Sequence, residues 1–86
     1  MAYSVHVVKS AKKELAALAK RDQRRIVKAI AGLAQEPRPN GVRKMHGSQD
    51  AYRIRVGDYR IIYQIFDKKL VVRVIRVGNR KDVYRR

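Results

Sequence analysis

The chain has 86 residues, and the 45% that are hydrophobic suffice for the core of one small domain, expected to span residues 1–86, which excludes a disordered basic tail. Its 22 Lys and Arg outnumber 7 Asp and Glu, and the formal net charge of +15 predicts a polyanionic partner, either nucleic acid or an acidic protein. The absence of cysteine excludes disulfides and thiolate metal sites, and the lack of a long apolar run or a signal peptide predicts a cytoplasmic protein without membrane contact.

The first half of the chain predicts one strand and two helices. Residues 3–8 alternate apolar and polar side chains and are rich in valine, which is typical of a strand. A helix over residues 11–20, capped by Ser10, and a second over residues 23–35, capped by Asp22, should form a helical hairpin. Pro37 then ends the second helix and opens a loop. The side chains expected on the inward face of the second helix are Ile26, Val27, Ile30, Leu33 and Ala34.

The second half predicts four consecutive strands, over residues 42–46, 51–56, 59–66 and 70–77. Short polar segments separate them and read as turns. The fold class is therefore α+β, with the order β-α-α-β-β-β-β. We expect a curved antiparallel sheet with the N-terminal helical hairpin on one face.

The hairpin around Gly57-Asp58 carries the strongest signal of a binding site. With these two residues as the loop, Arg55 lies directly opposite Arg60, and Arg53 lies two positions away on the same side. Like charges placed opposite one another destabilise an antiparallel pair, which indicates a site built to bind an anion. Arginine binds phosphate through two parallel hydrogen bonds, whereas lysine would serve solubility equally well. The opposite face, which the helices should cover, carries Tyr52, Ile54, Val56, Tyr59, Ile61, Tyr63 and Ile65.

The predicted helices add a second basic surface. Several of its cations stand four residues apart, where they repel one another instead of forming ion pairs. This surface is either an ordinary solvated helix face or a contact with the backbone of a nucleic acid. Its residues are Lys12, Lys13, Lys20, Arg21, Arg24, Arg25 and Lys28.

The chain offers few groups for other kinds of catalysis. His6 and His46 stand on different elements and the acids are scattered, so we predict no metal ion and no cofactor. Arginines stabilise a pentacovalent phosphate, and a tyrosine can stack on a base or take part in proton transfer. This set suits RNA cleavage by the substrate's own 2′-hydroxyl group.

Four segments in order, at residues 44–47, 51–55, 59–63 and 77–84, make the chain resemble the RelE family of toxin–antitoxin toxins. The resemblance implies an endoribonuclease that enters the ribosomal A site and cuts mRNA by 2′-hydroxyl attack, leaving a cyclic phosphate. It also implies an acidic, partly disordered, RelB-like antitoxin, which wraps the toxin and with it represses their own operon.

The resemblance also assigns site residues. Two basic residues of the hairpin fall on Arg53 and Arg55, and the arginine that stabilises the transition state falls on Arg60. Arg80 corresponds to the leaving-group acid or phosphate clamp, and Tyr84 to the tyrosine that stacks on the mRNA base. We add to the predicted RNA-binding surface the basic residues of these segments and of the basic sheet face: Lys44, His46, Arg73 and Lys81.

One departure from the family and two alternatives stay open. The best-known members have lysines where this chain has Arg53 and Arg55, and arginine is a poor general base because it keeps its proton. ParE-type toxins of the same superfamily share the fold, poison DNA gyrase and cleave no RNA. A small RNA- or ribosome-binding protein without catalysis would use the same basic faces.

Overall fold

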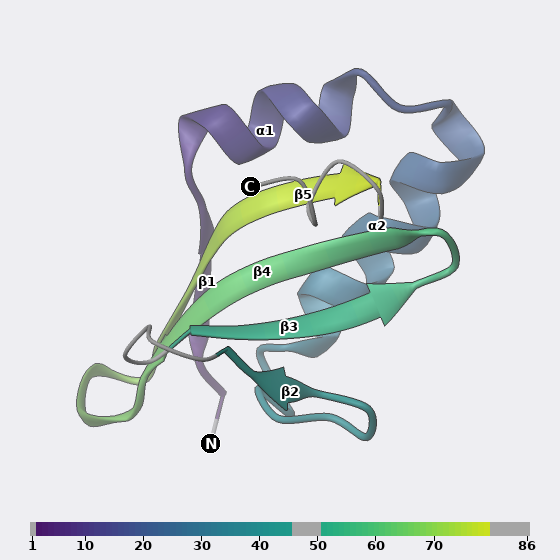
Figure 1. The fold of residues 1–86 in the computed structure, drawn as a ribbon. Helices are drawn as coiled ribbons and strands as arrows, with labels where there is room; N and C mark the ends of the chain where they lie inside the picture. The colour runs from purple at the N-terminus through teal and green to yellow at the C-terminus, as the bar shows by residue number, and fades with distance from the viewer. Residues whose placement is uncertain (1, 46–50, 80–86) are drawn as a thin grey trace.

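The computed structural model describes residues 2–45 and 51–79 of the chain. The elements follow one another as β1 (Ser4–Val7), α1 (Lys9–Ala16), α2 (Lys20–Gly32), β2 (Arg43–Lys44), β3 (Ala51–Val56), β4 (Tyr59–Phe66), the 3-10 turn η1 (Asp67–Lys69) and β5 (Val71–Asn79). In Figure 1, α2 lies behind the sheet and α1 runs along its β5 side. The predicted α+β class and element order are confirmed.

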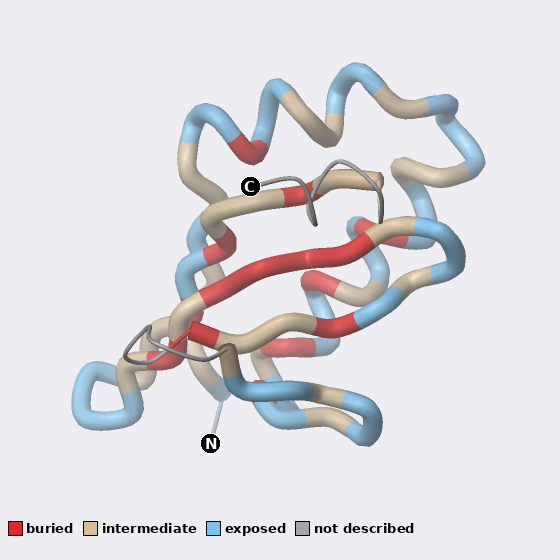
Figure 2. The backbone as a smooth tube through the Cα atoms, viewed as in Figure 1, coloured by how far each residue is buried: buried red, intermediate tan, exposed pale blue. Residues whose placement is uncertain are grey.

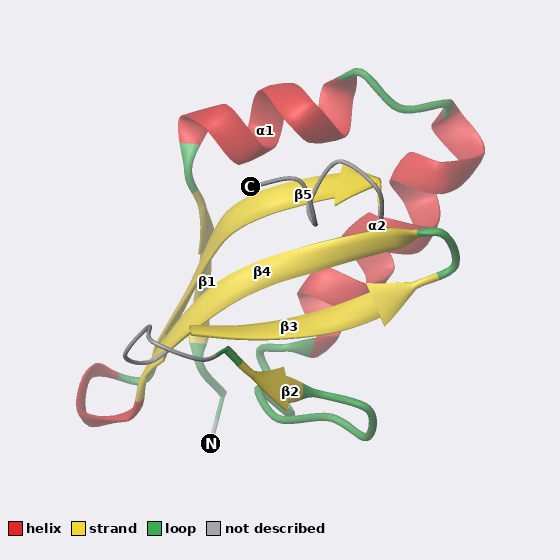
Figure 3. Ribbon diagram, in the orientation of Figure 1, coloured by secondary structure: helices red, strands yellow, loops and turns green. Residues whose placement is uncertain are grey.

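The five strands form one sheet in the order β1-β5-β4-β3-β2. Strands β2 to β5 pair antiparallel, as predicted, whereas β1 pairs parallel to β5. The sheet is therefore mixed, and the expectation of a wholly antiparallel sheet was wrong at this edge. The two helices carry the chain from the β1 edge to the β2 edge (Figure 3), so β1 can lie beside the last strand in the same direction.

The hydrophobic core lies between the helices and one face of the sheet. Tyr63 and Ile61 of β4 are fully buried there, and Figure 2 shows buried residues along most of this central strand. The predicted helix-covered face is confirmed, since Tyr52, Val56 and Tyr59 pack as partly buried residues against the core. The buried members of this core are Ala11, Ile26, Ile30, Leu33, Ile54, Ile61, Tyr63, Ile65, Val72, Val74 and Val77.

The predicted helix caps were wrong. Helix α1 begins at Lys9 and α2 at Lys20, so Ser10 and Asp22 lie inside the first turns, and neither N-cap residue makes a side-chain hydrogen bond. The Asp22 carboxylate instead accepts a hydrogen bond from the Tyr59 hydroxyl at 3.1 Å. Both helices also end earlier than predicted, at Ala16 and Gly32. Neither they nor any other helix in the described ranges could cross a membrane.

The inward face of α2 is narrower than predicted. Ile26, Ile30 and Leu33 are buried, but Val27 is 50% exposed. Spacings of four and three residues place the three buried side chains in one stripe, and Val27 falls beside that stripe. The placement of Val27 in the core was therefore wrong.

Strand β5 is irregular in a way that affects the site. The register slips between Ile62 and Tyr63, and past this bulge Gly78 lies opposite Arg60. Strand β1 ends at Val7, and along the uncovered part of the β5 edge the Val77 amide donates to Glu14 Oε1 of α1 at 2.9 Å. Helix α1 thus satisfies one backbone donor of the part of this edge that the shorter β1 leaves open.

Candidate active site

The predicted hairpin register is confirmed. Val56 pairs with Tyr59 and Arg55 pairs with Arg60, and Arg53 lies opposite Ile62 on the same side of the sheet. Directly paired residues of an antiparallel sheet have Cβ atoms about 5 Å apart. Two cationic side chains therefore start from neighbouring points of the sheet, at the end of the hairpin.

Helix α2 holds the tip of this hairpin. Gly57 has φ +59°, which L side chains rarely adopt. A Cβ atom at this glycine would lie 3.0 Å from Nη2 of Arg25, so the guanidinium group lies directly over the turn. Tyr59, two residues after Gly57, is held to the same helix by its hydrogen bond to Asp22, and this bond raises the pKa of Tyr59. Helix α2 therefore holds the tip of the hairpin from the sheet face opposite Arg53, Arg55 and Arg60.

A third strand brings another arginine to the pair. In β2, Arg43 pairs with Arg53 and Lys44 pairs with Tyr52. A cavity of about 30 Å³ lies at this point, lined by Gly41, Arg43, Arg53, Ile54, Arg55 and Arg60. A water needs about 10–15 Å³, so the cavity holds roughly two water-sized atoms, and a phosphate group would lie at its mouth with its oxygens directed inward. We call this the arginine cavity.

The sequence analysis missed Arg43. Its short strand was predicted, but the strand was not docked against a neighbour. The predicted bounds, residues 42–46 and 51–56, would place Lys44 opposite Arg53, whereas the structure pairs Arg43 with Arg53, so the sequence did not predict this register.

Arg60 differs from the other cations of the cavity because it is only 3% exposed. It lies on the central strand between Arg55 and Gly78, a residue without a side chain. Arginine side chains carry positive charge and offer several N–H donors, so the cavity is a cationic site. Four arginine side chains line it. The arrangement can bind a phosphate and stabilise charge that develops on it, but it supplies no general base.

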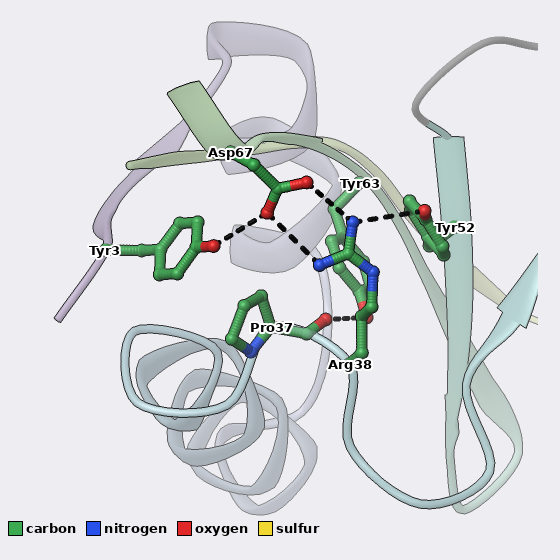
Figure 4. Close-up of polar contacts among 6 residues, drawn as sticks. All are labelled: Tyr3, Pro37, Arg38, Tyr52, Tyr63 and Asp67. Atoms are coloured by element: carbon green, nitrogen blue, oxygen red, sulfur yellow. Dashed lines mark hydrogen bonds and ion pairs between the residues drawn. The ribbon is translucent and has the colours of Figure 1, made fainter. Parts of the chain in front are cut away.

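A network of side chains surrounds the loop that leads to β2 (Figure 4). Arg38 donates two hydrogen bonds to Asp67, at 2.8 and 3.2 Å, and one to the Tyr52 hydroxyl at 3.3 Å. The Tyr3 hydroxyl donates to the same carboxylate at 2.7 Å, and these partners lower the pKa of Asp67 to about 2. The Tyr63 hydroxyl donates to the Pro37 carbonyl at 2.7 Å, and burial raises the pKa of Tyr63 to about 12.

The other predicted site residues fall into three groups. Arg73 is exposed on β5, opposite Gln64 and beside His6, and Lys44 shares a row with Tyr52 instead of the arginines. The predicted residues His46, Arg80, Lys81 and Tyr84 lie outside the described residues. The helix cations are exposed and belong to the other layer of the fold: Lys12, Lys13, Lys20, Arg21, Arg24, Arg25 and Lys28.

Comparison with known proteins gives the chain a family. A family model described as the ParE toxin of the type II toxin–antitoxin system parDE matches residues 5–84. The chain belongs to the RelE/ParE family of toxins. The mRNA interferase toxin RelE of Escherichia coli K12 is 34% identical over 88 residues, which cover 98% of this chain and 92% of that protein. Toxin RelG of Mycobacterium tuberculosis is 32% identical over 87 residues, with both chains fully covered.

Solved structures of RelE/ParE toxins agree with the fold. The archaeal RelE–RelB complex from Pyrococcus horikoshii OT3 contains a chain that matches with a TM-score of 0.83 and 35% identity. The match covers 93% of this chain and 97% of that chain. The M. tuberculosis RelBE2 complex matches with a TM-score of 0.82 and 27% identity, over 93% of this chain and all of that one. The resemblance inferred from the four sequence segments is therefore confirmed.

Proposed function

We propose that the chain is the toxin of a type II toxin–antitoxin module and cleaves mRNA in the A site of translating ribosomes. The observation that carries the proposal is the arginine cavity, where Arg43, Arg53, Arg55 and Arg60 line one small space. Relatives about one third identical over their whole length are named mRNA interferases, which supports RNA as the polyanion.

The arginine cavity suits attack by a ribose 2′-hydroxyl on the adjacent phosphate. The attack forms a bond from the 2′-oxygen to phosphorus and breaks the bond to the 5′-oxygen of the next nucleotide, leaving a 2′,3′-cyclic phosphate. Negative charge grows on the phosphate oxygens in the transition state, and fixed cations around them lower its free energy. In this proposal Arg60 stabilises that charge, while Arg53 and Arg55 hold the phosphate.

Proton transfer needs groups other than these arginines. A proton leaves the 2′-hydroxyl and another reaches the 5′-oxygen, and an arginine, which has donors and no acceptor, is a poor base for the first. By the family resemblance, Arg80 serves the leaving group and Tyr84 stacks on the mRNA base. The first proton then passes to water or to a group of the ribosome, with the toxin contributing alignment and charge.

The proposed partners follow from the charge of the chain. A net charge of +15 favours the ribosome and its mRNA, with the exposed helix cations contacting nucleic-acid backbone. Several structures of similar toxins are complexes of RelE with RelB, which supports a RelB-like antitoxin here. We expect that antitoxin to be acidic and partly disordered. We expect operator DNA to be bound only through the toxin–antitoxin complex, and the toxin to act in the cytoplasm.

Primer extension on a translated mRNA, after brief induction of the toxin, tests the proposal. We expect cuts inside codons that require translation and disappear with Arg60→Ala. Lys68→Ala is the matched control, because it removes one cation from an exposed turn away from the arginine cavity. Cuts that persist in Arg60→Ala would reject the assigned site.

A second activity has support from the family model, whose description names ParE. A ParE-like toxin would arrest growth by acting on DNA gyrase and leave mRNA intact. Growth arrest without mRNA cuts, together with accumulation of broken or relaxed DNA, would favour this activity. Binding to ribosomes with neither effect would favour a binding protein.

A further inference from the structure

Strand β2 needs support from outside the sheet. It consists of two residues, paired to β3 at Arg43–Arg53 and Lys44–Tyr52, and the first of these pairs places two cations opposite each other. Like charges in such a pair repel and favour separation of the strands. The bond from the Met45 amide to the Ala51 carbonyl at 2.9 Å extends this ladder by one step. So short a ladder still offers little to oppose the repulsion, yet Arg43 must stay in place if it is to line the arginine cavity.

The loop before β2 begins at a fixed point. The buried hydroxyl of Tyr63 binds the Pro37 carbonyl, and the next residue, Arg38, binds Asp67 through two hydrogen bonds. The Arg38 guanidinium group also donates to the Tyr52 hydroxyl, and its central carbon lies 5.1 Å from the centre of that ring. Arg38 is thereby tied to the β4–β5 turn and to β3 at once, as Figure 4 shows.

Tyr52 also contacts the other end of this loop. After Arg38 the chain turns at residues 39–42, closed by the bond from the Val42 amide to the Pro39 carbonyl at 3.1 Å, with Gly41 at φ +88°. It then returns as β2, where Lys44 pairs with Tyr52. Residues 38 and 44 therefore both attach to Tyr52, and the segment between them carries Gly41 and Arg43 to the cavity.

We infer that Arg38 is a positioning residue: its clamp on Asp67 and Tyr52 holds the Gly41–Arg43 wall of the arginine cavity against β3. Arg38 is not itself a lining residue of the cavity, so its effect on an anion passes through Arg43. The inference rests on the proposed function in one respect, that the anion bound in the working enzyme is the phosphate to be cleaved.

A double-mutant cycle between Arg38 and Arg43 tests this, with the affinity for inorganic phosphate measured by calorimetry at low salt. We expect Arg43→Ala to weaken phosphate binding by up to about fivefold, as for one partly exposed charge contact, and Arg38→Gln to weaken it by a similar factor. With both changes, binding should be no weaker than in Arg43→Ala alone, because the clamp acts only through that residue. Lys68→Gln, in the same turn as Asp67, should leave the affinity unchanged.

Two further variants separate positioning from general stability. Arg38→Lys keeps an ion pair with Asp67 but cannot bind both carboxylate oxygens and Tyr52 in one plane, so its affinity should lie between those of the wild type and Arg38→Gln. Asp67→Asn should act like Arg38→Gln, and it replaces that variant in the cycle if Arg38→Gln does not fold. Urea unfolding verifies that each variant is folded under the assay conditions.

The outcomes are distinct from those of the nuclease test. If Arg38→Gln weakens phosphate binding equally with and without Arg43, or does not weaken it, or if the wild type binds no phosphate, the inference is overturned. If the coupling is present but mRNA is not cut, the nuclease proposal fails while the clamp stands.

Discussion

Replacing Arg55 with glutamine should make the protein more stable and less active. Arg55 lies directly opposite Arg60, which is 3% exposed. The Cβ atoms of such a pair start about 5 Å apart. Two unit charges held at that separation would repel by roughly 0.8 kcal/mol in water and roughly 3 kcal/mol at an effective dielectric constant near 20. Arg55 itself is exposed and its guanidinium group can turn away, so we expect a gain of about 1 kcal/mol in the free energy of unfolding.

The gain should appear as a rise of roughly 4–8 °C in Tm, measured by circular dichroism in dilute buffer. It should nearly vanish in 1 M NaCl, where the screening length falls to about 3 Å. Phosphate should also reduce it, because an anion bound between the two arginines stabilises the wild type more than the variant. Cleavage of mRNA by the variant at subsaturating substrate should fall by up to about fivefold, as for the loss of one partly exposed charge contact to the phosphate that Arg55 is proposed to hold.

Arg73→Gln is the matched control, since Arg73 is an exposed arginine on the same sheet whose partners in register are Gln64 and His6. It lowers the net charge by the same amount without removing a facing pair of cations. Equal Tm values for the two variants at low salt, or a gain in Arg55→Gln that salt does not change, would refute the repulsion argument.

Two other predictions concern parts of the fold that support the arginine cavity. Gly57→Ala should lower the free energy of unfolding by about 1–2 kcal/mol because φ is +59°. Gly57→Asn should lower it by less, since asparagine tolerates this conformation better. Both variants add the same Cβ atom beside Arg25, so equal losses in chemical denaturation would indicate crowding against Arg25 instead of backbone strain. The pKa of Asp67 is about 2 when folded, below its usual 3.8, so its ionised form stabilises the fold above about pH 4, and that stabilisation disappears as pH falls from 4 toward 2. The difference in urea stability between the wild type and Asp67→Asn should therefore be constant above pH 5 and shrink below pH 4; a difference that is the same at pH 2.5 and pH 6 would contradict it.

The hairpin that forms the centre of the site was predictable because several local signals agree there. Alternation of side chains sets two faces, Gly57-Asp58 fits a two-residue turn, and shifting the register by one residue would expose Ile54 and Ile61. The pairing of Arg55 with Arg60 follows from these constraints alone. Local chemistry and global burial point to the same register, so counting along the sequence was sufficient.

The features that were missed depend on contacts between distant segments. Asp22 has a side chain suited to a helix cap, but its bond to Tyr59 links positions 37 residues apart, and nothing in the neighbouring sequence distinguishes the two roles. The clamp of Arg38 on Asp67 spans 29 residues and forms only after the sheet has brought the β4–β5 turn beside the loop. Such tertiary contacts determine where the helices end and where Arg43 lies, and local sequence propensity does not predict them.

Three acidic residues in the described part of the chain hold the sheet from positions outside the lining of the arginine cavity. Of the 7 Asp and Glu in the chain, Asp22 binds the hairpin tip through Tyr59, Asp67 binds the loop before β2 through Arg38, and Glu14 binds the β5 edge at Val77. No acid is among the residues that line the cavity within the described ranges. Contacts at the periphery of the cavity oppose the repulsion between the arginines inside it. A carboxylate introduced at Gly41, which lines the cavity, should abolish phosphate binding even where the fold survives.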